Sequence, residues 1–309
     1  MRCAEPMIGA VDIGGTKIAV GLVDPQGRLQ GWRQFPTAKW QVSLEGICRC
    51  LQELTSECSG ALKGIGIGCT GPVYPMLGTV GQVEFLPDWN GVDIAGELSH
   101  CSGVPTALEN DADAAALGEA AWGTGRGASR FILVTVGTGI GGGMVFDGSL
   151  YRGVDGSHPE IGHHVIDLSG PLCYCGARGC WEMLASGPGM AAWLRANAPA
   201  GYPDLETINA KTICALAQQG DPLARQAVAH EGDMLGTGLA NLINLFSPDR
   251  IALSGSVMHS WRLFSERVLR TIRQNCTLVP REKTRIALAS LGPNSGLIGA
   301  ARVYLHRYG

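Results

Sequence analysis

Two separate stretches of this chain repeat one order of elements, and this repeat constrains the fold more than any other feature of the sequence. Residues 7–23 are predicted to form a buried strand, the turn Gly14-Gly15-Thr16 and a second strand. Residues 131–146 repeat that order, with a glycine-rich turn over 137–143 between two apolar strands. In each copy an Asp/Gly turn then leads into a third strand. We interpret the repeat as an internal duplication.

The segments beyond each glycine turn add helices and further strands. Apolar residues recur at helical spacing over 44–54, a short strand is expected at 64–69, and an alanine-rich helix at 111–122. In the second copy the predicted elements are a helix at 221–245, a strand at 250–254, and helices at 257–275 and 297–308. The pattern predicts an α/β fold in which β-β-β-α-β-α occurs twice, with an insertion in the second copy.

Composition excludes several classes of protein. The formal net charge of −3 gives no electrostatic reason to expect nucleic acid or an anionic membrane as a partner. The longest uncharged apolar stretch, residues 131–146, falls below the roughly 20 residues that span a bilayer, and the first residues lack a signal-peptide pattern. We therefore expect a soluble, cytoplasmic protein. In that reducing compartment the eleven cysteines would be buried hydrophobes, redox groups or metal ligands.

The two glycine turns are candidates for binding a nucleotide. In DIGGTK (residues 12–17), glycines between two strands allow backbone N–H groups to converge on a phosphate, and Asp12 at the end of the strand can hold Mg²⁺ through water. An ordinary β-hairpin is the alternative. The second turn has five glycines in seven positions, more than a hairpin needs. Two such turns at matching points of a duplicated fold can hold one nucleotide between them.

A carboxylate precedes the alanine-rich helix, within Glu109-Asn110-Asp111. Asn or Asp at this point is ordinarily an N-cap, and that alternative stays open. A carboxylate held there can also accept the proton of a sugar hydroxyl as the hydroxyl attacks a γ-phosphate. Asp111 is therefore a candidate general base.

Three cysteines and a histidine are spaced as metal ligands. His163 precedes Cys173, Cys175 and Cys180, which together supply a Cys₃His set for tetrahedral Zn²⁺. Buried free thiols and a redox pair are the alternatives, although Cys-x-Cys strains a disulfide loop. A closed set of four ligands leaves no position for a catalytic water, so we expect the zinc to be structural.

Taken together, these motifs resemble those of the ROK family (repressors, open reading frames and kinases). They occur in the family's order along nearly the whole chain: DIGGTK, ENDADAAALGE, TGIGGG, HPEIGHH, CYCGARGCWE and SGLIGAA. The resemblance, closest to glucokinase-like members of the hexokinase–actin superfamily, implies two actin-like (ribonuclease H-like) lobes with a nucleotide and sugar cleft between them. We expect a small lobe over 1–120 and a larger lobe over 121–309 that contains the zinc loop, with the last helix packing back on the first lobe.

The same resemblance implies an activity and its residues. It implies ATP with Mg²⁺, a structural Zn²⁺, and phosphate transfer to a hexose or N-acetylhexosamine, with Asp111 as catalytic base. The sugar ligands that it implies are Asn110, Asp111, Glu160, His163 and Glu182. The nucleotide contacts are Asp12, Gly14, Gly15, Thr16, Lys17, Gly137, Thr138, Gly139 and Gly255.

Two positions depart from the family pattern. Ser254-Gly255-Ser256 stands where two adjacent glycines are common, which puts the adenosine contact in doubt. Asp113 stands where Asn is usual, and we expect that change to be tolerated because Asp113 would point elsewhere on the helix than Asp111.

Rival functions are weighed against the same residues. A sugar-sensing repressor would need a DNA-binding domain, and only eleven residues precede Asp12. An actin-like ATPase that binds no sugar would have no reason for PEIGH beside a zinc cluster.

The expected partner is a small-molecule hexose, and we expect neither nucleic acid nor a membrane as partner. We also expect the protein to form a homodimer. The resemblance ranks glucose first, because glucokinase-like members of the family place Glu three residues before the zinc His, as Glu160 stands before His163 here. An N-acetylhexosamine (N-acetylmannosamine or N-acetylglucosamine) ranks second and fructose third.

Overall fold

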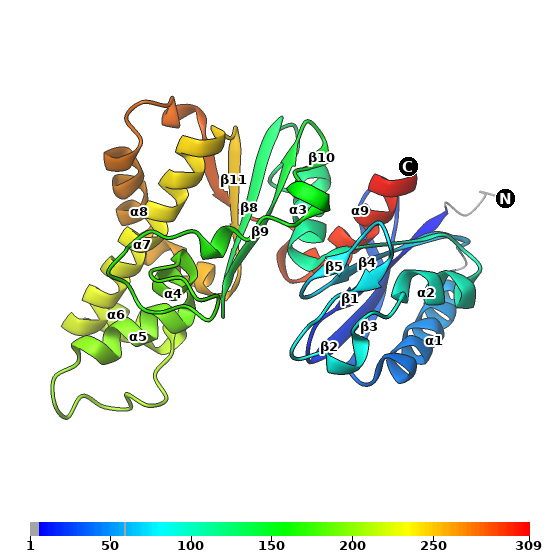
Figure 1. Ribbon diagram of the computed structural model, residues 1–309, viewed down its shortest axis with the longest axis horizontal. Coiled ribbons are helices and arrows are strands. Elements are labelled where there is room, and N and C mark those ends of the chain that lie inside the picture. The colour runs from blue at the N-terminus through cyan, green and yellow to red at the C-terminus, as the bar shows by residue number, and fades with distance from the viewer. Residues whose placement is uncertain (1–5, 59) are drawn as a thin grey trace. The chain divides into compact units, whose positions relative to one another are not determined.

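The computed structural model describes residues 6–58 and 60–309, which form two compact units (Figure 1). Unit 1 comprises the described residues up to Ser129 together with Gly143–Pro159 and Ala289–Gly309. Unit 2 comprises Arg130–Gly142 and Glu160–Leu288. The chain therefore passes from one unit to the other at four points.

Unit 1 is built on a five-stranded mixed sheet of order β3-β2-β1-β4-β7. Strand β1 pairs antiparallel with β2 and parallel with β4, and β4 pairs parallel with β7. The carboxyl ends of β1, β4 and β7 therefore meet at one edge of the sheet. The strands are β1 (Met7–Ile13), β2 (Lys17–Val23), β3 (Leu29–Pro36), β4 (Leu62–Cys69) and β7 (Thr106–Asn110), and β5 (Val73–Tyr74) and β6 (Thr79–Val80) form a separate hairpin.

Helices cover both faces of this first sheet (Figure 1). Side chains of β1 point alternately to the two faces of the sheet. Val11 and Ile13 pack with α1 and α2, whereas Ile8 and Ala10 pack with α9. This alternation follows from the two-residue period of a strand. The helices are α1 (Trp40–Cys58), α2 (Ile94–Ser102), α3 (Asp111–Trp122) and α9 (Ser295–Tyr308).

A second mixed sheet repeats the order of the first, β10-β9-β8-β11-β12. Its strands are β8 (Arg130–Val136), β9 (Ile140–Phe146), β10 (Ser149–Leu150), β11 (Arg250–Ser254) and β12 (Arg285–Leu288). The helices of unit 2 are α4 (Trp181–Ala185), α5 (Gly187–Asn197), α6 (Ala210–Gln219), α7 (Pro222–Phe246) and α8 (Trp261–Asn275), and α7 packs against the other four. The predicted α/β fold with an internal duplication is confirmed in this shared strand order.

Short 3₁₀ helices connect several of these elements. They are η1 (Pro87–Trp89), η2 (Val154–Gly156), η3 (Ile161–His163), η4 (Ser256–Ser260), η5 (Arg281–Lys283) and η6 (Gly292–Asn294). The helix predicted from residue 257 therefore begins only at Trp261, after η4.

The second glycine turn is shorter than predicted, because β9 begins at Ile140. Gly142 and Gly143 lie within that strand, where a side chain has no room. A Cβ atom on Gly142 would lie 2.2 Å from the backbone oxygen of Leu133, and one on Gly143 would lie 2.6 Å from the Cβ of Ala116. These glycines therefore serve close packing, and only residues 137–139 form the turn.

Close packing of α9 on α3 fixes the helix that begins at Asp111. A Cβ atom on Gly118 would lie 2.9 Å from the Cα of Gly299, so the two helices approach at glycines. The buried Glu119 carboxylate accepts hydrogen bonds from the backbone N–H groups of Thr124 (2.7 Å) and Leu291 (2.8 Å). The end of α3 is thereby tied to the segment that leads into α9.

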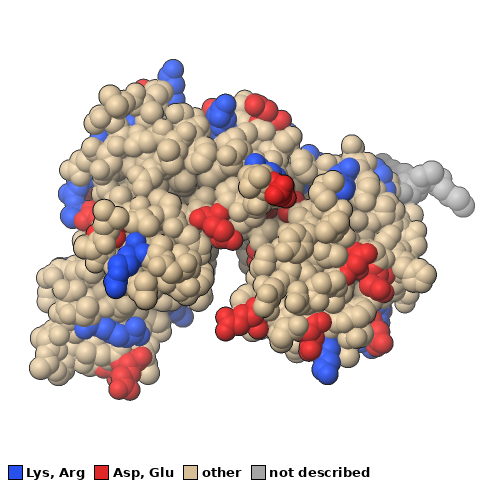
Figure 2. Space-filling view, viewed as in Figure 1, with Lys and Arg blue, Asp and Glu red and all other residues tan. Residues whose placement is uncertain are grey.

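Cys48 of α1 and Cys101 of α2 are joined by a disulfide, with Cα atoms 6.8 Å apart. The expectation of a reducing compartment did not predict this pairing. None of the helices in the described residues has both the length and the apolar character needed to cross a bilayer. On the face shown in Figure 2, most of the surface belongs to residues other than Lys, Arg, Asp and Glu, in keeping with the 17% of charged residues in the chain.

Candidate active site and metal site

Two carboxylates lie close together at the edge of the first sheet. Asp12 is the penultimate residue of β1, and Asp111 begins α3 directly after β7. Burial, and next the negative charge of Asp111, raise the pKa of Asp12 to about 6, while Lys17 opposes the shift. Burial also raises the pKa of Asp111, although a hydrogen bond from the backbone N–H of Ala112 lowers it. Such a pair of partly desolvated carboxylates favours a cation or a proton between them.

The N-cap of α3 is Asn110. Its side-chain oxygen accepts hydrogen bonds from the backbone N–H groups of Ala112 (2.9 Å) and Asp113 (3.3 Å). Asp111 is the first residue of the helix, and its Oδ1 accepts from the N–H of Ala112 at 2.8 Å. The capping role thus falls to Asn110, and Asp111 supplies a carboxylate at the positive end of the helix.

Asp113 is fully buried and carries an ion-pair network that the sequence did not reveal. Its Oδ2 binds the guanidinium of Arg152 and lies 2.6 Å from Nδ1 of His158. Arg152 also pairs with Glu109, with 2.7 Å between Nη2 and Oε2. Burial raises the pKa of Glu109, and Arg152 opposes that shift. The charge of Asp113 is therefore matched by partners 39 and 45 residues further along the chain, which the sequence analysis did not predict.

The first glycine turn presents its end to solvent. The N–H of Gly14 donates to the carbonyl of Lys17 at 3.0 Å, which closes the turn, and Thr16 and Lys17 are exposed. A Cβ atom on Gly15 would lie 2.6 Å from the ring of Phe85. The motif therefore leaves accessible backbone at the same end of β1 as Asp12.

The second glycine turn lies beside Gly255 in unit 2. The N–H of Gly137 donates to the carbonyl of Gly139 at 2.9 Å, and Thr138 is exposed between them. Gly255 has a φ of +97°, and a Cβ atom there would lie 2.2 Å from the backbone oxygen of Val136. Only glycine suits that position. The structure thus brings together the predicted nucleotide contacts of unit 2 at the carboxyl ends of β8 and β11.

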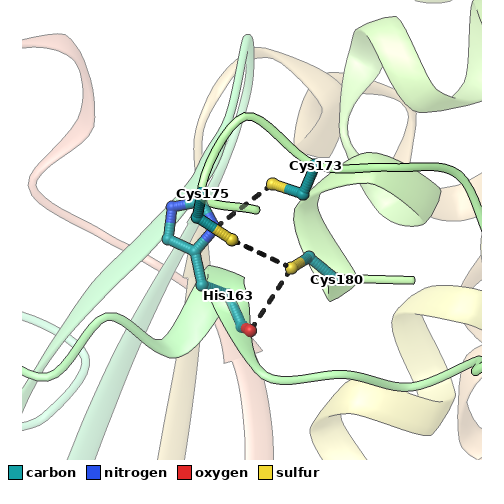
Figure 3. A group of neighbouring side chains, drawn as sticks. All are labelled: His163, Cys173, Cys175 and Cys180. Atoms are coloured by element: carbon teal, nitrogen blue, oxygen red, sulfur yellow. Dashed lines mark hydrogen bonds between the residues drawn. The ribbon is translucent and has the colours of Figure 1, made fainter. Parts of the chain in front are cut away.

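The predicted metal ligands converge on one point (Figure 3). The ligand atoms of His163, Cys173, Cys175 and Cys180 all lie within 4.8 Å of one another. Nδ1 of His163 is 3.6 Å from Sγ of Cys173, and the sulfurs of Cys175 and Cys180 are 3.5 Å apart. Bonds of about 2.0–2.3 Å to Zn²⁺ place tetrahedral ligands about 3.3–3.8 Å apart, so these four residues fit that ion.

Tyr174 lies between the metal ligands and a predicted sugar ligand, and the sequence analysis did not include it. Its hydroxyl is 2.9 Å from Nε2 of His163. Desolvation, and then the charge and hydrogen bond of Glu182, raise the pKa of Tyr174. The sequence held one signal for its role, since Tyr174 stands between the two predicted zinc ligands Cys173 and Cys175. His163, which is predicted as a sugar ligand, thus has the hydroxyl of Tyr174 beside its Nε2.

Glu182 and Glu160 occupy different settings in unit 2. Oε2 of Glu182 accepts a hydrogen bond from the backbone N–H of Ile140 at 2.8 Å, so this carboxylate stabilises the end of the second glycine turn. Glu160 is exposed, and its backbone oxygen accepts from the N–H of His163 at 3.0 Å. The short helix η3 therefore fixes the spacing between Glu160 and the metal cluster.

The predicted site residues thus form two groups, one in each unit. Asp12, the first glycine turn, Asn110 and Asp111 share one edge of unit 1. Unit 2 carries the second glycine turn, Gly255, Glu182, Glu160 and the metal cluster. The first group can accept a proton and hold a cation, and the second offers backbone N–H groups and hydrogen-bonding side chains.

Comparison with known proteins assigns the fold and these motifs to a family. The model of the ROK family matches residues 8–307, and the chain belongs to this family. It is 34% identical to a glucokinase of Streptomyces coelicolor, over 94% of this chain and 95% of that protein. It is also 28% identical to the xylose repressor of Bacillus subtilis, over 96% of this chain and 77% of the repressor.

Solved structures give the same result in three dimensions. The ROK hexokinase of Thermus thermophilus superposes with a TM-score of 0.82 at 32% identity, over 97% of this chain and 99% of that one. A ROK family glucokinase of Streptomyces griseus, in complex with glucose and AMPPNP, gives a TM-score of 0.77 at 32% identity, over 98% of this chain and all of that one. The resemblance drawn from the motifs is thereby confirmed.

Proposed function

We propose that this chain transfers the γ-phosphate of ATP to a hydroxyl of glucose, forming glucose 6-phosphate, with Asp111 as the general base. The chain is an ATP-dependent sugar kinase, because its sequence is similar to those of glucokinases, including one of known structure, over nearly its full length. The observation that supports the assignment of Asp111 is its position at the end of β7, beside Asp12 and free of the capping role.

The residues of unit 1 suit such a transfer. The Asp111 carboxylate would accept the hydroxyl proton, which is lost late in a loose transition state, and burial favours that uptake because it raises the pKa of Asp111. Asp12 would hold Mg²⁺, whose charge neutralises the phosphate oxygens. The glycine turns would donate backbone N–H groups to the phosphates, since no Cβ blocks their approach.

The Cys₃His cluster supports a structural role for zinc. Four protein ligands complete a tetrahedron, and the bound ion would hold together the loop from His163 to Cys180. Trp181 follows directly, and its Nε1–H donates to the backbone oxygen of Met234 on α7 at 3.1 Å. The loop is thereby anchored at its far end, which would fix Glu160 and Glu182 as sugar ligands.

The ranking of substrates rests on the side chains assigned to the sugar. Asn110, Glu160, His163 and Glu182 offer hydrogen-bonding groups, and a buried acceptor left unpaired costs about 1–3 kcal/mol, so a ring rich in hydroxyls suits the set. The glucokinase relatives favour glucose. An N-acetylhexosamine ranks second, in line with a structural neighbour described as a putative N-acetylmannosamine kinase, and fructose third. Similarity to a xylose repressor supports a sugar-sensing regulator as the other candidate function.

A coupled assay of ADP formation tests both parts of the proposal. The panel is glucose, N-acetylmannosamine, N-acetylglucosamine, fructose and xylose, and kcat/KM is expected to be highest for glucose. A tenfold preference for a competitor would overturn the ranking. Binding of a sugar without ADP formation would instead favour the regulator.

A further inference from the structure

A cavity of about 470 Å³ opens in unit 2, away from every residue assigned above to the reaction. Helices α7 and α8 form most of its wall. Four arginines line it: Arg225 of α7 and Arg267, Arg270 and Arg273 of α8. Residues three apart on a helix lie on the same face in successive turns, so the three arginines of α8 form one row. Figure 2 shows basic side chains at the edge of the molecule where Figure 1 places α8.

The positive charge of this cavity is only partly balanced. Arg267 binds Asp233 through its Nε and Nη2, each at 2.5 Å from a carboxylate oxygen. Within residues 6–58 and 60–309, neither Arg270 nor Arg273 makes an ion pair or a hydrogen bond, although the charge of Arg270 also lowers the pKa of Asp233. Glu266 is the one acidic residue among those that line the cavity. Four guanidinium groups thus face two carboxylates, which leaves two positive charges.

The chemistry of the wall defines the ligand. A guanidinium is planar and offers paired N–H donors that match the oxygens of phosphate, and such charge-assisted bonds are stronger than neutral ones. A phosphate monoester carries close to two negative charges at neutral pH, which matches the excess. Val228, Ala229 and Leu263 give the cavity an apolar side as well. Its volume lies in the range of about 300–1,000 Å³ typical of small-molecule sites.

We propose that the α7–α8 cavity binds a small phosphorylated metabolite. Arg270 and Arg273 hold the phosphate, and the carbon skeleton contacts Val228 and Leu263. This site goes beyond the proposed kinase activity, because it uses none of the residues assigned to ATP, sugar or zinc.

Titration calorimetry with glycerol 3-phosphate tests the site, with glycerol as the neutral control. The double variant Arg270→Ala/Arg273→Ala removes the two unpaired guanidinium groups. The matched control is Arg262→Ala, an exposed arginine of the same helix that does not line the cavity. All three arginines are exposed, so these changes are expected to leave the unfolding midpoint nearly unchanged.

The wild type and Arg262→Ala are expected to bind glycerol 3-phosphate alike, and the double variant to bind it at least about tenfold more weakly. Failure of the wild type to bind the probe at millimolar concentration would overturn the proposal. So would equal weakening in Arg262→Ala, which would indicate a diffuse basic surface. Binding that survives in the double variant would place the probe elsewhere. None of these results depends on which sugar the enzyme phosphorylates.

Discussion

Replacing Arg152 by methionine is expected to lower the free energy of unfolding by about 3–5 kcal/mol, the range for breaking a buried ion pair. The Arg152 side chain is 20% exposed, and its partners Asp113 and Glu109 are 0% and 10% exposed. Methionine preserves most of the packing volume but removes the charge, so two carboxylates remain buried with less compensation. His158 still contacts Asp113, which keeps the expected loss within this range.

A double-mutant cycle measured by urea unfolding separates this cause from lost packing. Asp113→Asn combined with Arg152→Met should destabilise the protein less than the sum of the two single changes, by about 1–3 kcal/mol, because the Asp113 charge is then absent and only Glu109 is left without Arg152. Arg33→Met serves as the control, since the Arg33–Glu57 pair has side chains 42% and 54% exposed and should contribute less than about 1 kcal/mol. A loss below about 1 kcal/mol in Arg152→Met, or full additivity in the cycle, would refute the reasoning.

Two further predictions concern the metal site and the carboxylate pair. Zinc analysis should find about one zinc per chain in the wild type and in the control variant Cys58→Ser, but less in Cys175→Ser. Cys175→Ser should also bind sugar more weakly. A full zinc content in Cys175→Ser would remove Cys175 from the ligand set. Because the folded-state pKa of Asp12 is raised to about 6, its contribution to stability is lost as pH rises from about 4 to 6. In metal-free buffer Asp12→Asn should therefore be more stable than the wild type at pH 7.5, by roughly 2–3 kcal/mol, and equal to it near pH 4. If urea unfolding shows no increase in the free energy of unfolding at pH 7.5, the result would contradict the burial of Asp12 beside the charge of Asp111.

The parts of the molecule that could be predicted from sequence are those set by local patterns. The alanine-rich helix beginning at Asp111 follows from composition and spacing, and the two copies of the fold follow from the repeated glycine turns. The convergence of His163 with Cys173, Cys175 and Cys180 follows from their short separation in sequence. In each case neighbours along the chain determine the outcome.

The features that were missed depend on contacts between distant residues. Asp113 meets Arg152 and His158 only because the segment after β10 returns to α3, and no local pattern encodes that return. The turn predicted over 137–143 includes the glycines of β9, because no local pattern in the sequence encodes their packing against Leu133 and Ala116. The short strands β7 and β12 and helices α2, α4, α5 and α6 carry patterns too brief or too mixed to separate from loops.

The turnover of Asp111→Asn tests the central claim most directly. Asn110 caps the helix, and an asparagine at 111 can still accept the hydrogen bond from the N–H of Ala112, so the variant should fold. Its unfolding midpoint should be no lower than that of the wild type, because the repulsion between Asp111 and Asp12 is removed. Only the ability to take up a proton is lost. With glucose and ATP at saturation, we expect kcat to fall by roughly 10²–10⁴-fold, the usual contribution of a general base. A kcat within about threefold of the wild type, in a protein that folds normally, would contradict the assignment of Asp111 as the base.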